Sequence, residues 1–121
     1  MNRFKDLKVW QEAIKFSVEV YKLTKSFPPE EKYGLTSQIN RAAVSIASNI
    51  AEGAGRNSDK EFNQFLGIAA GSSFEVETQL IIAQQLNLIS KEDLENISAK
   101  INQIQNMLFK LQQSLKEKIY S

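Results

Sequence analysis

The stretch QINRAAVSIASNIAEG, residues 38–53, decides the fold, because an apolar line and a polar line run through it side by side. Ile39, Ala43, Ile46 and Ile50 recur at steps of three and four, which is the spacing of one helix face. The polar line has similar spacing: Gln38, Arg41, Ser45, Asn49 and Glu52. Alanines flank this polar line, so we expect a helix whose polar stripe is at least partly buried.

A buried polar stripe needs partners, since an unpaired polar group costs free energy when it leaves water. The partner is another helix, another subunit or a ligand. When the chain folds back on itself about residues 55–57, Arg41 comes level with residues 70–75, and we expect Arg41 and Glu75 to form an opposite-charge pair. The segment that follows the turn carries a polar line of its own: Glu61, Gln64, Ser72, Glu75 and Gln79.

In this arrangement Ser45 and Asn49 face residues 62–69. We interpret the polar stripe as structural, because it would fix the register between two helices or form a subunit contact. A groove for a ligand or a nucleic-acid strand is the alternative, and a catalytic site is the weakest interpretation, because nothing in the sequence activates a nucleophile. The candidate residues of the stripe are Gln38, Arg41, Ser45, Asn49, Glu52, Ser72, Glu75 and Gln79.

The composition excludes several classes of site. Cysteine and histidine are absent, which removes disulfides, thiolate nucleophiles, the commonest general base and the commonest metal ligand. Without histidine there is no Glu-x-x-His pair, so a ferritin-like di-iron site of the usual kind is excluded. A metal site built from carboxylates alone is left open by the composition, but we expect no catalytic activity, no cofactor and no metal centre.

Charge is unevenly distributed along a chain whose net charge is only +1. Residues 1–41 carry eight Lys or Arg against five Asp or Glu, residues 42–95 carry three against eight, and residues 96–121 carry four against one. This pattern favours attraction between the terminal and middle helices, or between subunits. It also offers a basic face for nucleic acid, although acidic residues interrupt that face. The candidate phosphate contacts are Arg3, Lys8, Lys15 and Lys22.

Breaking and capping residues divide the chain into helical segments. The proline pair Pro28–Pro29 ends the first segment, and Gly53–Gly55 provides the stop of the second. Gly34 leaves open a start of the second segment nearer Thr36. Within one domain of residues 1–121, we expect four helices over about residues 6–26, 30–53, 58–87 and 91–118.

The last two segments open with cap signatures. Ser58 with Glu61 forms a capping box, and Ser90 opens the final segment. The final segment then carries an uninterrupted heptad seam: Leu94, Ile97, Ile101, Ile104, Leu108, Leu111 and Leu115. Because short loops force neighbouring helices to run antiparallel, the sequence predicts an all-α, up-down-up-down antiparallel four-helix bundle.

Small residues occupy the middle of the third segment. Gly67 and Gly71 lie in a helix interior, where each glycine costs about 0.5–1 kcal/mol relative to alanine. A compensating close contact is therefore expected, and the alanine-rich second segment is its natural partner.

No apolar run is long enough to cross a membrane. The charged N-terminus leads into no signal-peptide core. We therefore expect a cytoplasmic protein with no membrane partner.

A long series of residues resembles one known family. The series includes Phe4, Trp10, Tyr21, Phe27–Pro28, Tyr33–Gly34–Leu35, the run RAAVSIxSNIAEG from Arg41 to Gly53, then Arg56, Phe62, Phe65–Leu66, Gly71–Ser72 and Glu75. On these residues the chain resembles the four-helix-bundle proteins named for intervening sequences in bacterial 23S ribosomal RNA genes. The resemblance covers about residues 4–90, and the last helix matches only in its heptads.

The resemblance implies a cyclic homo-oligomer, with a pentameric barrel favoured. It also implies kinship with the accessory protein of diversity-generating retroelements, which is thought to bind nucleic acid and a reverse transcriptase through a basic surface. This chain, with a net charge of +1, departs from that basic character. For most of the family no molecular role is established.

Two function hypotheses follow. The leading one is a non-enzymatic, oligomeric helical scaffold or adaptor. The alternative is an accessory protein that binds RNA or DNA, or a nucleic-acid enzyme, through basic faces of the first and last helices.

Overall fold

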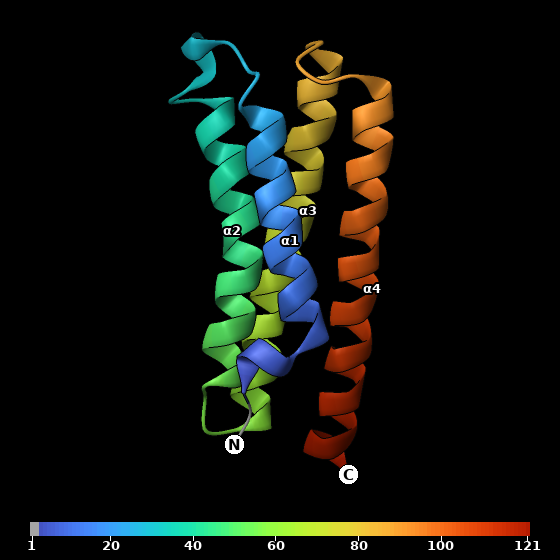
Figure 1. The fold of residues 1–121 in the computed structure, drawn as a ribbon. Helices are drawn as coiled ribbons and strands as arrows, with labels where there is room; N and C mark the ends of the chain where they lie inside the picture. The colour runs from blue at the N-terminus through green and yellow to red at the C-terminus, as the bar shows by residue number, and fades with distance from the viewer. Residues whose placement is uncertain (1–2) are drawn as a thin grey trace.

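The computed structural model describes residues 3–121, and within them it contains helices and no strand. The four long helices are α1 (Lys8–Thr24), α2 (Leu35–Ala54), α3 (Asp59–Gln85) and α4 (Lys91–Tyr120). Two short 3-10 turns, η1 (Phe4–Asp6) and η2 (Pro29–Glu31), precede α1 and α2. Figure 1 shows four rods that alternate in direction along the chain. The predicted all-α four-helix bundle is confirmed.

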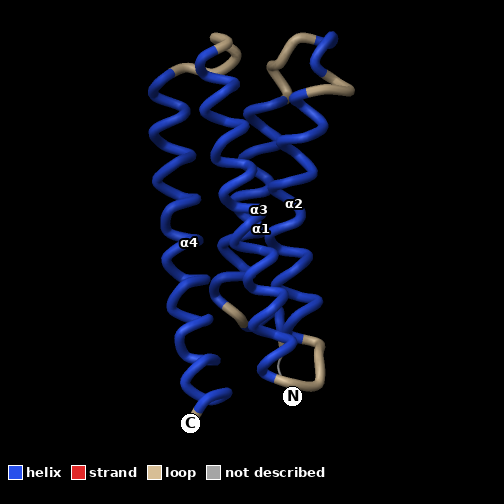
Figure 2. The backbone as a smooth tube through the Cα atoms, turned by 180° about the vertical axis from the view of Figure 1, so that it is seen from behind, coloured by secondary structure: helices blue, strands red, loops and turns tan. Residues whose placement is uncertain are grey.

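The helices form a ring in chain order. The most extensive pair is α2 with α3, while α1 packs on α2 and α4, and α3 also packs on α4. Among the described residues no Cα atom of α1 comes within 8 Å of one in α3, so these two helices lie on a diagonal of the bundle. Figures 1 and 2 agree with this arrangement, because α1 and α3 exchange front and back positions between the two views.

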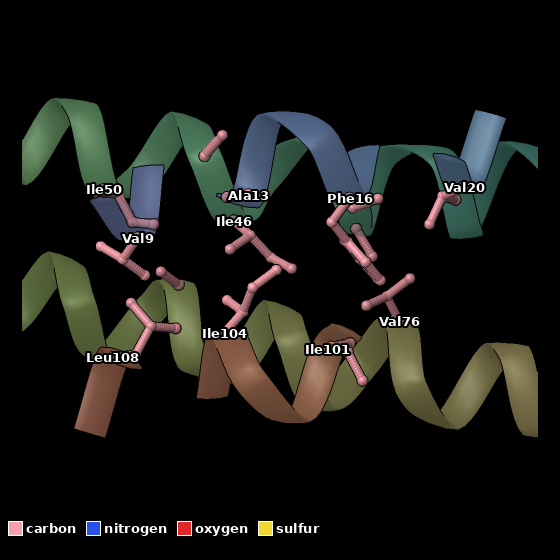
Figure 3. Packing of buried hydrophobic residues seen from close by; sticks show 14 of the residues in the cluster. Val9, Ala13, Phe16, Val20, Ile46, Ile50, Val76, Ile101, Ile104 and Leu108 are labelled. Carbon is pink, nitrogen blue, oxygen red and sulfur yellow. The ribbon is translucent and has the colours of Figure 1, made fainter. Parts of the chain in front are cut away.

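The core forms where the four apolar faces meet. Ile39, Ala43, Ile46 and Ile50 are each fully buried, as their periodicity predicts. Figure 3 shows Ile46 and Ile50 of α2 opposite Ile104 and Leu108 of α4, with Phe16 and Val20 of α1 closing the same space. The heptad seam of α4 supplies its share of this core, with Leu94 and Leu111 half-buried and the other five members buried.

The helix ends follow the cap residues. The Ser58 hydroxyl accepts a hydrogen bond from the backbone N–H of Glu61 at 3.1 Å, and the Ser90 hydroxyl accepts one from that of Asp93 at 3.0 Å. These bonds satisfy donors that have no partner within the helix. Asn87, with φ of 62°, turns the chain between α3 and α4.

The second helix begins later than residue 30. Residues Pro29–Glu31 form η2, and α2 begins at Leu35 directly after Gly34, which has the irregular angles φ −113° and ψ −112°. The start nearer Thr36 is therefore the accurate one. The boundary at residue 6 is also corrected, because η1 occupies Phe4–Asp6 and α1 begins at Lys8.

Gly53 brings α2 and α3 together instead of ending α2. It lies buried inside the last turn of α2, and a Cβ atom there would stand 2.6 Å from the Cβ of Phe65 and 3.0 Å from the Cδ1 of Phe62. Only a residue without a side chain allows this approach. The helix ends at Ala54, and Gly55 caps it with an ordinary φ of −84°.

The predicted close contact between the slim middle of α3 and α2 forms through Ser72, but Gly67 and Gly71 take no part in it. Both are exposed. A Cβ atom at Gly71 would meet nothing within 4 Å, and one at Gly67 would meet only the Nε2 of Gln112 at 3.8 Å. Ala69 and Ser72 supply the slim side that is buried in the bundle.

No helix within residues 3–121 combines the length and the hydropathy that a membrane crossing requires.

The Gly53 contact generates a stability prediction. Replacement of Gly53 by alanine should lower the free energy of unfolding by about 1–3 kcal/mol, because the new methyl group overpacks against Phe65 and Phe62. Chemical denaturation followed by circular dichroism measures the change. Ser48→Ala, at an exposed position of the same helix, is the matched control and should be near neutral. An unchanged transition in Gly53→Ala would contradict the proposed close contact.

Candidate functional site

The predicted polar stripe is buried only at its centre. Ser72 and Gln79 of α3 are buried, and Ser45 and Asn49 of α2 are half-buried. The remaining members lie exposed on the surface: Gln38, Arg41, Glu52 and Glu75. The expectation of at least partial burial is therefore correct for Ser45, Asn49, Ser72 and Gln79, and wrong for the four exposed residues.

A compact hydrogen-bonded group joins the two helices at that centre. The hydroxyl oxygens of Ser45 and Ser72 lie 2.8 Å apart. The Nδ2 of Asn49 donates to the hydroxyl of Ser45 at 2.9 Å and to its carbonyl oxygen at 2.8 Å. Ser45 thus bonds to a residue beyond the expected range 62–69. We call Ser45, Asn49 and Ser72 the serine–asparagine cluster.

Arg41 and Glu75 come together without forming an ion pair. Both line one surface pocket of about 460 Å³, with Tyr33 and Gln38 among its other walls. No contact within 4.0 Å joins the two charges in the part of the chain that the structure describes. Arg41 and Glu75 lie level with each other, as predicted from the chain folding back about residues 55–57. Both are long, exposed side chains, for which pairing gains little over solvation by water.

Two buried amide oxygens have no hydrogen-bond partner within residues 3–121: the Oε1 of Gln79 and the Oδ1 of Asn63. The periodicity of the sequence places Gln79 in the stripe, but it carries no signal for Asn63. The carboxylate of Glu77 is better satisfied, since its Oε1 accepts from the Nε2 of Gln105 at 2.9 Å. This bond ties α3 to α4 on the side away from the serine–asparagine cluster.

The chemistry available in the stripe is hydrogen bonding and isolated charge. Within residues 3–121 no three acidic side chains gather in a way that could hold a metal ion. The hydroxyl groups of the cluster bond to each other and to an amide. Its arrangement suits the positioning of two helices.

Ion pairs interrupt the predicted basic face. Lys8, Lys15 and Lys22 are exposed at steps of seven residues along α1. Lys15 lies 3.9 Å from Glu12, and Arg3 lies 3.8 Å from Asp6. The second acidic residue of α1, Glu19, pairs with Lys100 of α4.

Sequence reasoning missed an apolar groove between α1 and α2. The groove has a volume of about 600 Å³ and is lined by Val18, Tyr21 and Val44, with Lys22 and Lys25 on its edge. Half of the surface of Tyr21 is exposed at this groove. The signal in the sequence is that Val18 and Val44 are apolar although they lie off the core lines of their helices.

Two side-chain hydrogen bonds join α1 to α2 at this groove. The Ser17 hydroxyl donates to the carbonyl oxygen of Ala43 at 3.2 Å, and the Thr24 hydroxyl donates to the Oδ1 of Asn40 at 2.9 Å. These bonds hold α1 against α2, so the groove is part of the folded bundle.

The serine–asparagine cluster generates a double-mutant prediction. Ser45→Ala should lower the free energy of unfolding by about 1–3 kcal/mol, because it leaves the Ser72 hydroxyl and the Asn49 amide short of a partner. Ser45→Ala combined with Ser72→Ala should cost less than the sum of the single changes. Denaturant titration of the four proteins measures this coupling.

Arg41→Ala is the control, and at this exposed position it should change the free energy of unfolding by no more than about 0.5 kcal/mol. Strict additivity of the two serine changes would show that their hydrogen bond does not couple the helices.

Comparison with known proteins agrees with this architecture. The chain matches the family model of the 23S rRNA-intervening sequence protein over residues 5–110, which extends the resemblance into α4. It is also similar to a crystal structure from Bacteroides thetaiotaomicron, that of a protein with unknown function from the S23 ribosomal protein family. No curated protein matches the chain.

The similarity to the solved structure holds over nearly the whole bundle. The two chains are 27% identical, with a TM-score of 0.81, and the match covers 87% of this chain and 95% of that chain. The family model spans all of α1, α2 and α3 and most of α4. The chain therefore belongs to the family of 23S rRNA-intervening sequence proteins.

Proposed function

We propose that the protein is a non-enzymatic scaffold or adaptor that works as an oligomer of identical helical bundles. The observation that carries this proposal is the exposure of large apolar side chains on two separate helices. About half of the surface of Val18 and Tyr21 on α1, and of Ile68 and Phe74 on α3, is open to water. Large apolar side chains left open to water on a folded bundle are available to a protein partner.

The rest of the site supports a structural role. The serine–asparagine cluster joins α2 to α3. The solved relative carries no assigned activity. A scaffold needs a rigid body with free surfaces, and the bundle provides both. The cytoplasm remains the expected location.

Self-association is measured directly by size-exclusion chromatography with light scattering at micromolar concentration. We expect a mass of several chains, and a pentamer would give about 68.5 kDa, five times the 13.7 kDa of one chain. Dilution should shift a reversible assembly toward smaller species. A mass of one chain at all concentrations would refute the oligomeric scaffold.

Nucleic-acid binding is a second candidate, because Lys8, Lys15 and Lys22 lie exposed at seven-residue steps along one side of α1. Such a row could follow a phosphate backbone of RNA or DNA. Lys8 and Lys22 take part in no ion pair within residues 3–121.

Titration of a labelled RNA oligonucleotide tests this candidate. If the three lysines contact phosphates of a single strand, the affinity should fall with salt at a logarithmic slope of about −2. Replacement of all three by glutamine should remove most of this dependence. The matched control neutralises three exposed lysines elsewhere: Lys32, Lys60 and Lys91. Absence of binding at low salt would exclude the candidate.

A further inference from the structure

One surface pocket brings opposite charges together on neighbouring helices without pairing them. It has a volume of about 460 Å³ and is formed by α2, α3 and the turn before α2. Arg41 of α2 and Glu75 of α3 both line it, and neither takes part in an ion pair within residues 3–121. We call this space the Arg41–Glu75 pocket. Its guanidinium and its carboxylate are both available to a ligand.

The helices that carry these charges are fixed relative to each other. Ser45 lines the pocket, and its hydroxyl oxygen lies 2.8 Å from that of Ser72. The same hydroxyl accepts a hydrogen bond from the Nδ2 of Asn49 at 2.9 Å. The backbone positions of Arg41 and Glu75 are therefore set by the fold, and a ligand has to order only their side chains. This keeps the entropic cost of binding small.

The two charges select a ligand that carries both signs close together. Arg41 and Glu75 lie level with each other on adjacent helices, so the charges that they bind must also be neighbours. A guanidinium donates two parallel hydrogen bonds to a carboxylate, and a carboxylate accepts hydrogen bonds from an ammonium group. A simple anion would be repelled by Glu75, and a simple cation would be repelled by Arg41. An α-amino acid carries a carboxylate and an ammonium group on one carbon atom and pairs with both residues.

The other walls of the pocket suit an aromatic side chain on that amino acid. Tyr33 lines the pocket with a ring that is 89% exposed, so the ring is open to a ligand. Two aromatic rings attract each other in stacked and edge-to-face arrangements. Ser37 and Gln38 add a hydroxyl and an amide to the walls. The volume also lies in the range of about 300–1,000 Å³ that is usual for small-molecule sites.

We propose that the Arg41–Glu75 pocket binds a free α-amino acid with an aromatic side chain. Arg41 donates hydrogen bonds to the carboxylate of the ligand, Glu75 accepts from its ammonium group, and Tyr33 packs on its ring. Because the pocket is open to water, we expect a dissociation constant on the order of 1 mM. This site and the oligomeric scaffold do not depend on each other.

Matched ligands test the recognition of both charges. L-Phenylalanine, added to the ¹⁵N-labelled protein, should shift the backbone amide signals of residues around the pocket. 3-Phenylpropanoate lacks the ammonium group and phenethylamine lacks the carboxylate. Each should bind about tenfold or more weakly than phenylalanine, because each loses one charge-assisted contact. Equal affinities for all three ligands would show that the charges are not recognised, and would overturn the proposal.

Charge variants test the two residues. Arg41→Gln and Glu75→Gln should each weaken phenylalanine binding about tenfold or more. The exchange of Arg41→Glu with Glu75→Arg keeps one charge of each sign in the pocket, so the ligand can bind in the reverse orientation. Its affinity should return to within about threefold of the parent. Lys110→Gln with Glu117→Gln removes one exposed charge of each sign from α4, and this control should bind like the parent.

The remaining outcomes separate this site from the proposed function. Circular dichroism melts should show that every variant folds like the parent, since Arg41 and Glu75 are exposed. Absence of signal shifts at about 10 mM phenylalanine would overturn the proposal, as would binding that survives both glutamine variants. If the parent assembles but does not bind phenylalanine, only this site is wrong. If the parent is a single chain that binds phenylalanine, only the oligomeric scaffold is wrong.

Discussion

The close approach of α2 to α3 is the constraint on which the rest of the bundle depends. Gly53 lets the end of α2 meet Phe62 and Phe65 near the start of α3. Further along the same pair, the short side chains of Ser45 and Ser72 meet hydroxyl to hydroxyl. With this pair fixed, the apolar side of α1 and the heptad seam of α4 have one surface on which to pack.

The architecture follows from the sequence because its signals are local. Periodicity identified the buried line of α2 and the seam of α4, and cap residues placed the starts of α3 and α4. Gly34 already indicated that the second helix could begin late. What periodicity does not resolve is whether a turn of proline and glutamate continues as an α-helix or as the 3-10 turn found at Pro29–Glu31.

The candidate site was less predictable, because residues that share one helix face can still differ in burial and in the partners they reach. The register places Arg41 level with Glu75, yet both side chains are exposed and form no ion pair with each other. Gly67 and Gly71 were assigned to the wrong side, although Leu66, Ala69 and Ser73 mark the buried line and the glycines lie off it. Half-exposed positions such as Tyr21 and Val18 are the hardest to place, since a core and an interface select the same residue types.

An even number of antiparallel helices gives the molecule two unlike ends. The short turn η1 and the C-terminus of α4 lie at the same end of the bundle, and the α1–α2 and α3–α4 connections lie at the other (Figure 1). Anything attached to either terminus therefore emerges from one pole. In a closed ring of identical copies whose bundles stand along the ring axis, all attached segments would gather on a single rim, and the opposite rim would present the α1–α2 and α3–α4 connections.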